Sequence, residues 1–322
     1  MIRWRFGPDD LARTRFAISP MWETASAIRA LRNPSQVALH LPWVKQIRPS
    51  IRHMDLSLAF ALLPRQGYIA DFLTPPPTTP LASFEDELEV VRSTSADQVL
   101  HDVEMLVECG NPSDELEEFR RDPEGAVVEL ANVLSEFWLR ALEPHWPRIR
   151  SLLEADLLYR SRRLTEGGLD LLFSDLHPGV EWNGGATLDL TENECEYDIA
   201  LDGRGLLLVP AVFSCGKPAA MTEAEWQPTV IYPARGIGLL WESAGSTPDA
   251  LAKVLGRGRA ALLADLDAPR TTTDLAHRLE MTPGGISQHL GALKDAGLVT
   301  AQRNGRSVLY CRSALADELV EA

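Results

Sequence analysis

The sequence predicts an α+β protein of two domains: a mixed helical N-terminal domain with a small antiparallel sheet, then a small C-terminal domain of helices and one β-hairpin. Its 322 residues, 45% of them hydrophobic, suffice for about two cores. Apolar residues recur with helical spacing before residue 166 and after residue 248, and short extended runs lie between them. Ser243–Pro248 (SAGSTP) has the composition of a linker. We therefore expect domains over residues 1–247 and 248–322.

The N-terminal domain begins with a strand, a short helix and a second strand over Ile2–Ser19, because Ile2, Trp4 and Phe6 alternate with arginines. Helical apolar spacing follows in seven stretches: Pro20–Arg32, Met54–Leu63, Ile69–Leu73, Phe84–Val91, Ala96–Cys109, Pro123–Leu142 and His145–Thr165. After Gly167-Gly168, apolar runs between turn residues predict the strands of the sheet: Leu169–Phe173, Ala186–Leu190, Glu196–Leu201, Leu206–Phe213 and Thr229–Tyr232.

The C-terminal domain opens with Leu251–Leu266, which predicts one or two helices with a break near Gly256–Gly258. The hydroxyls of Thr271-Thr272-Thr273 suit the N-cap of a short helix that runs through Leu279. After a tight turn, Thr282 as N-cap and Pro283 at the first position begin a second helix over Pro283–Ala296, which Gly297 ends.

This second helix has two distinct faces. Ile286, Leu290 and Leu293 share one face, which leaves a polar face rich in glycine: Gly284, Ser287, Gln288 and Gly291. Such a face at a helix N-terminus suits insertion into a DNA major groove. Strands over Leu298–Thr300 and Ser307–Tyr310 flank the basic tip Gln302–Arg306, with an Asn-Gly turn. A helix–turn–helix followed by a basic hairpin is a winged helix.

The net charge of −15 argues against a nucleic-acid partner only if its distribution is ignored. Residues 249–322 hold nine basic and nine acidic residues, whereas the first 248 residues hold 22 basic and 37 acidic ones. No acidic residue occurs from Ala296 to Ala316. A local positive patch can therefore exist on an acidic protein, whose remaining surface would suppress non-specific DNA binding.

Residues 271–310 resemble the ArsR/SmtB family of winged-helix repressors. The matching residues are Leu275-Ala276, Ser287-Gln288-His289-Leu290, Leu293, Ala296-Gly297-Leu298-Val299, Arg303, Gly305-Arg306 and Tyr310. The N-terminal domain looks like those of large actinobacterial regulators of this class. The resemblance implies a homodimer on a palindromic operator. We expect the segments that flank the hairpin, Leu251–Leu266 and Ala314–Val320, to form part of the dimer interface.

By the same resemblance, Ser287, Gln288 and His289 would read the operator, while Arg303 and Arg306 would contact its backbone or minor groove. His289 has a second interpretation as a packing residue, because it lies three positions after buried Ile286. The full set of expected DNA-binding residues is Thr282, Gly284, Ser287, Gln288, His289, Lys294, Arg303, Asn304, Arg306 and Tyr310.

Metal sensing is not expected. Members that sense metals carry a Cys-x-Cys at the place where this chain has Thr271-Thr272-Thr273, and the tail Ser313–Ala322 has no histidine. The N-terminal domain holds all eight tryptophans, which can line an apolar pocket, so we expect a small organic ligand there to control DNA binding.

Two rival functions for the N-terminal domain stay open, an enzyme and a protein-interaction scaffold. The chain contains no GxSxG, Walker, HExxH or GxGxxG motif, and the catalytic candidates reduce to His177 and Glu194-Cys195-Glu196. We therefore expect no catalytic residues, cofactor or metal. Without an apolar run of about 18 residues or a signal-peptide core, we expect a cytoplasmic protein with no membrane partner.

Overall fold

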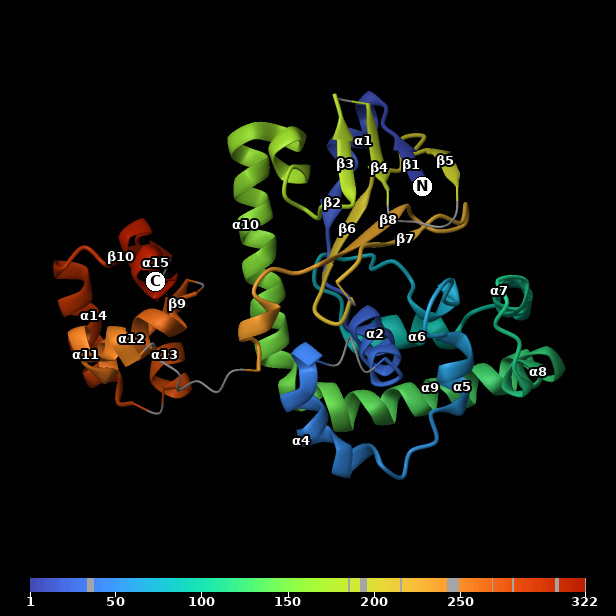
Figure 1. The fold of residues 1–322 in the computed structure, drawn as a ribbon, viewed down its shortest axis with the longest axis horizontal. Helices are drawn as coiled ribbons and strands as arrows, with labels where there is room; N and C mark the ends of the chain where they lie inside the picture. Colours follow the sequence, from blue (N-terminus) through green and yellow to red (C-terminus); the bar gives the residue numbers. More distant parts are fainter. Residues whose placement is uncertain are drawn as a thin grey trace. The chain divides into compact units, whose positions relative to one another are not determined.

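The computed structural model describes residues 1–33, 38–184, 186–191, 196–214, 216–241, 249–267, 269–279, 281–304 and 307–321. These residues form two compact units, Met1–Leu240 and Trp241–Ala322 (Figure 1). The expected linker Ser243–Pro248 lies outside the described residues. Helix and sheet are mixed, as the sequence predicts.

The first unit contains two four-stranded sheets instead of the one antiparallel sheet that the sequence predicts. The first has the order β3-β4-β1-β5, in which β1 pairs with β4 antiparallel and with β5 parallel. The second has the order β2-β6-β8-β7, with β2, β6 and β8 parallel. The bounds are β1 Ile2–Arg5, β2 Arg15–Phe16, β3 Val180–Asn183, β4 Thr187–Leu190, β5 Tyr197–Ala200, β6 Leu207–Ala211, β7 Ala219–Met221 and β8 Thr229–Pro233.

The prediction of a single antiparallel sheet was wrong for a physical reason. Alternation and turn residues identify strands locally, but they do not reveal that N-terminal Ile2 pairs with Leu190 on one side and Tyr197 on the other. The chain between β6 and β8 passes through β7 and is long enough for β8 to return parallel to β6.

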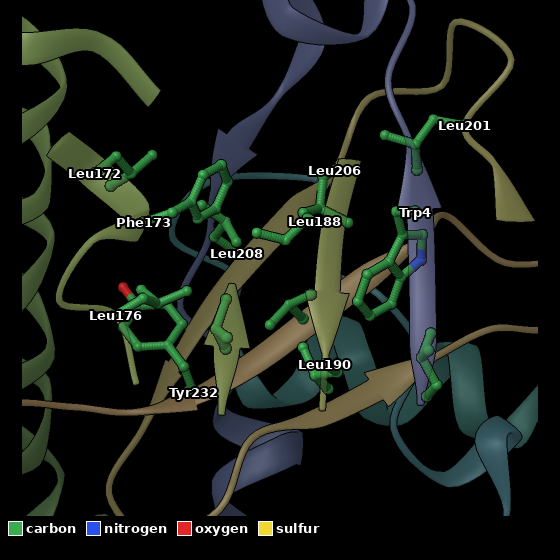
Figure 2. Packing of buried hydrophobic residues seen from close by; sticks show 13 residues of the cluster. Trp4, Leu172, Phe173, Leu176, Leu188, Leu190, Leu201, Leu206, Leu208 and Tyr232 are labelled. Atoms are coloured by element: carbon green, nitrogen blue, oxygen red, sulfur yellow. The ribbon is translucent and has the colours of Figure 1, made fainter. Parts of the chain in front are cut away.

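The expected strand Leu169–Phe173 is wrong, because these residues are the last turns of α10 (Trp146–Phe173). The backbone is not helical at Gly167 (φ −149°) and Gly168 (φ +65°), so α10 consists of two helical segments, and Leu169–Phe173 belong to the second. A five-residue apolar run does not distinguish a strand from a buried helical turn. Leu172 and Phe173 enter the core that residues of both sheets form, where Figure 2 shows Phe173 beside Leu208.

The remaining helices of this unit lie mostly where the sequence places them. Their bounds are α1 Pro8–Arg13, α2 Pro20–Leu31, α4 Leu41–Ile51, α5 Ser57–Leu62, α6 Phe84–Arg92, α7 Ala96–Glu108, α8 Asp114–Arg121 and α9 Pro123–Phe137. The sequence missed α4, which contains Pro49, and α8, whose buried residues are only Leu116 and Phe119. Helix over Met54–Leu63 begins only at Ser57, and Ile69–Leu73 contains just a 3₁₀ turn, Asp71–Leu73.

The second unit builds one core from its helices and a small sheet. Its elements are α11 Asp249–Leu255, α12 Arg257–Asp265, β9 Arg270–Thr271, α13 Thr272–Arg278, α14 Pro283–Asp295, β10 Val299–Asn304, β11 Ser307–Arg312 and α15 Ala314–Glu321. The predicted break between α11 and α12 falls at Gly256, whose φ is +83°. The hairpin β10–β11 gains a third strand, β9, which the sequence did not indicate.

Candidate nucleic-acid interface

Helices α13 and α14 follow each other closely, and each begins at a capping threonine. Thr271 accepts a hydrogen bond from the backbone N–H of Asp274, and the Asp274 carboxylate accepts one from the backbone N–H of Thr271. The Thr282 hydroxyl accepts from the Gly285 N–H at 3.2 Å, and Pro283 occupies the first position of α14. The first cap fixes where α13 begins, and the second fixes where α14 begins.

Helix α14 presents the two faces that its sequence predicts. Ile286, Leu290 and Leu293 are buried with residues of α12 and α13. The opposite face is exposed and carries Gly284, Ser287, Gln288 and Gly291. A Cβ built at Gly284 or Gly291 would meet no atom within 4 Å, so a partner can approach this backbone closely. Thr282 and Lys294, at the two ends of the helix, are exposed as well.

His289 does not share this exposed face. Its ring is half-buried and lies against Gly258 near the start of α12, where an added Cβ would come within 2.9 Å of Nε2. The structure therefore separates His289 from Ser287 and Gln288, in line with the packing interpretation.

The β-hairpin follows α14 directly. Gly297, with a φ of +71°, ends the helix, and β10 pairs with β11 from Val299↔Arg312 to Asn304↔Ser307. Arg303 is exposed one residue from the end of β10, whereas Tyr310 is half-buried and packs on the core. Arg306 and the Asn-Gly turn lie outside the described residues, as does the side chain of Asn304.

The carboxylates of this unit are largely engaged away from the exposed face of α14. Asp265 accepts from the Arg278 guanidinium at 2.9 and 3.0 Å, and this hydrogen bond raises the pKa of Arg278. Asp317 pairs with Arg312 at 2.8 Å. Among the described residues, Lys294 and Arg303 form no ion pair, so their charges are available to an anionic partner.

The comparisons with known proteins bear on this same region. Residues 261–301 match the family model of bacterial regulatory proteins of the arsR family. The match covers the second half of α12, then β9, α13, α14 and part of β10, so the chain carries an ArsR-type helix–turn–helix. No curated protein and no solved structure matches the chain. A helix–turn–helix of this type indicates a DNA-binding transcriptional regulator.

Two hollows of the N-terminal unit, described by itself, bear on the expected ligand pocket. A cavity of about 10 Å³ lies between α2, the second sheet and residues 74–77, and it has room for one water molecule. An open groove of about 270 Å³ lies beside β1 and α1, where Arg5, Asp9 and Asp202 contribute charge. Neither is the large closed apolar pocket that the tryptophans led us to expect. Four of the eight tryptophans, Trp4, Trp22, Trp43 and Trp138, are buried in the core. Trp43, for example, is fully buried and its indole N–H donates to the Ala141 carbonyl at 2.8 Å.

The described residues contain no group of three or more His, Cys, Asp or Glu side chains that could hold a metal ion. In the same part of the chain, no helix is long and apolar enough to cross a membrane. His177 is held at both ring nitrogens, because Nδ1 accepts from the Gly179 N–H and Nε2 lies 3.1 Å from the Gly216 carbonyl. Glu194 and Cys195 lie outside the described residues.

Proposed function

We propose that this protein is a transcriptional repressor that inserts the exposed face of α14 into the major groove of a palindromic operator. The observation that carries the proposal is the capped helix α14, whose glycine-rich polar face stands exposed in an ArsR-type helix–turn–helix. Ser287 and Gln288 contact base edges in this arrangement. The hairpin acts as the wing, and Arg303 at its tip contacts the phosphate backbone.

Base reading by Gln288 and phosphate contact by Arg303 predict different effects of substitution on DNA binding. Gln288→Ala removes a side chain that reads bases, so it should relax sequence preference at a cost of about 1–3 kcal/mol. Arg303→Ala removes a phosphate contact, so it should weaken binding to all sequences and lower the slope of log K against log salt by about 0.9.

The test begins with a duplex that the full chain selects from a randomised library. Fluorescence anisotropy then follows salt titrations on that duplex and on an unrelated one. Arg162→Ala, an exposed arginine of α10, controls for the loss of one positive charge. If Gln288→Ala discriminates between the duplexes as well as the wild type does, α14 does not read the bases.

We propose further that the protein binds as a homodimer through α11 and α15. Both helices leave apolar side chains in solvent: Val254 is 80% exposed, Leu315 54% and Leu319 39%. Leu315 and Leu319 lie one turn apart and so share a face of α15. A second copy of the chain would cover these residues, and two recognition helices one DNA turn apart would read an inverted repeat.

Control by a small organic ligand needs a different site from the closed pocket that the sequence suggested. We place it at the open groove beside β1 and α1, whose carboxylates Asp9 and Asp202 favour a neutral or cationic compound over an anion. The test is a thermal-shift screen of metabolites against the full chain, with EDTA and with zinc. A compound that stabilises the wild type should lose its effect on Asp9→Asn with Asp202→Asn; retention of the effect would place the ligand elsewhere.

An enzymatic role for the N-terminal unit has less support. The two ring nitrogens of His177 are engaged by backbone groups, so the ring has no nitrogen left to move a proton to or from a substrate. Catalytic turnover of a compound from the screen would favour the enzyme instead.

A further inference from the structure

Helices α12 and α14 cross at a glycine. Gly258, the second residue of α12, faces the His289 ring, and a Cβ at this position would lie 2.9 Å from Nε2 and 3.4 Å from Cε1. Contacts under 3.0 Å force something to move, so only glycine permits this approach without a shift of α12 or of the ring. The crossing therefore fixes the start of α12 beside α14.

The crossing lies at the edge of the exposed face of α14. Successive residues of an α-helix are 100° apart, so His289 stands one step from exposed Gln288 and one step from buried Leu290. The residue that touches α12 thus lies on the flank between the two faces. The start of α12 accordingly borders the surface that we assign to the major groove.

Two arginines flank the glycine at this edge. Arg257 and Arg259 are exposed, and neither forms an ion pair with any residue that the structure describes. The Arg259 Nε donates to the Leu255 carbonyl at 2.6 Å, which holds the stem of this side chain and leaves its terminal nitrogens for another acceptor. Arg270, Arg278 and Arg312 of the same unit differ, because each is paired with a carboxylate.

We propose that Arg257 and Arg259 contact the phosphates of the DNA strand that borders the groove beside α14. The inference rests on the proposed function and extends the interface to one flank of the recognition helix. Guanidinium groups match the geometry of phosphate oxygens, and a partly held side chain loses less entropy on binding. The contact between Gly258 and the His289 ring positions the start of α12, and with it both arginines.

The test compares the full chain with Arg257→Ala/Arg259→Ala on the selected duplex and on an unrelated duplex. Each lost phosphate contact lowers the log–log salt slope by about 0.9, which corresponds to about 8-fold in affinity near 0.1 M salt. We expect the double variant to lose a slope of about 1.8 and about 60-fold in affinity on both duplexes, with the ratio between them unchanged. Arg48→Ala/Arg162→Ala removes two exposed charges from the N-terminal unit as a matched control.

The outcomes separate this inference from the proposed function. If Gln288→Ala relaxes sequence preference but the double variant keeps the wild-type slope, only the contact by α12 is wrong. A double variant that sediments as a monomer would place the arginines between copies of the chain. Tighter binding would indicate that they pair with an acidic surface of the protein. Either result overturns the proposal. If the wild type selects no duplex, both proposals fail.

A second set of variants tests the crossing. Gly258→Ala should push the His289 ring away and weaken binding, and His289→Ala in that background should restore most of the loss by making room for the methyl group. His289→Ala alone should leave base preference unchanged. A change in base preference would mean that His289 reads DNA directly and that α12 is not seated on it.

Discussion

A single hydroxyl group, that of Thr282, caps the start of α14. Thr282 is exposed, and its hydroxyl accepts the Gly285 N–H that would otherwise lack a partner inside the helix. The same side chain is a candidate contact for DNA. Its two roles can be separated, because serine keeps the hydroxyl and loses only the methyl group.

We predict that Thr282→Ala lowers the unfolding free energy of the C-terminal unit by about 1 kcal/mol, because the cap is lost at the first turn of α14. DNA binding should weaken in parallel. Thr282→Ser should behave nearly as the wild type in both chemical denaturation and anisotropy measurements. A serine variant that is stable but binds poorly would show that the threonine methyl group touches the operator.

Among the elements of the C-terminal unit, α15 has both a buried and an exposed apolar face. Ala316 is fully buried in the core of the C-terminal unit, whereas Leu315 and Leu319 point into solvent. One face of the helix therefore packs on the core of its own unit, and the other presents exposed apolar side chains that another surface can bind.

We predict that Leu315→Asp prevents formation of the proposed homodimer, because a charge would be buried against apolar side chains in such a dimer. Sedimentation velocity should show the change in mass, and affinity for the selected duplex should fall at least 100-fold. Val128→Asp, at an exposed apolar position of α9, is the control and should leave both properties unchanged. A Leu315→Asp variant that remains dimeric would exclude α15 from the interface.

Across the N-terminal unit, buried carboxyl groups join segments that are distant in the sequence. The Glu23 carboxylate accepts the backbone N–H groups of Val212 and Phe213, and Glu87 accepts that of Met21. Farther along, Asp156 accepts the Tyr232 hydroxyl at 2.8 Å and the Arg235 N–H at 3.1 Å. The chain that leads out of this unit is thus anchored on α10.

Burial raises the pKa of Glu23 and of Glu87 from 4.5 to about 8. Between these values the folded state binds protons that the unfolded chain has released, so the unfolding free energy should fall as the pH rises from about 5 to about 8. We expect a loss on the order of a few kcal/mol, measured by urea titrations across this range. Glu87→Gln keeps an acceptor for Met21 and should flatten the dependence. An unchanged pH profile in this variant would mean that Glu87 does not titrate in this range.

The two units differ in how far their sequences predicted them. In the C-terminal unit, caps such as Thr271 and Thr282 and the helical spacing of Ile286, Leu290 and Leu293 act within a few residues, so the sequence predicted the helices and the exposed face. The position of His289 depends on Gly258, which lies 31 residues earlier in the chain, and only the structure brings the two together. The sheet topology could not be predicted for the same reason, because β1 at the N-terminus pairs with strands beyond residue 180.

The uneven distribution of the tryptophans provides an intrinsic fluorescent probe of one part of the protein. All eight lie at or before Trp241, and the elements from α11 to α15 contain none. Intrinsic tryptophan emission therefore reports on the N-terminal unit and on Trp241, which follows it. The helices α11 to α15, which include the proposed DNA contacts, do not contribute to this emission. A change in emission when a duplex is added would originate outside the elements that touch it. Tryptophan fluorescence could thus detect a conformational change in the N-terminal unit when DNA binds to the C-terminal unit, without any added dye.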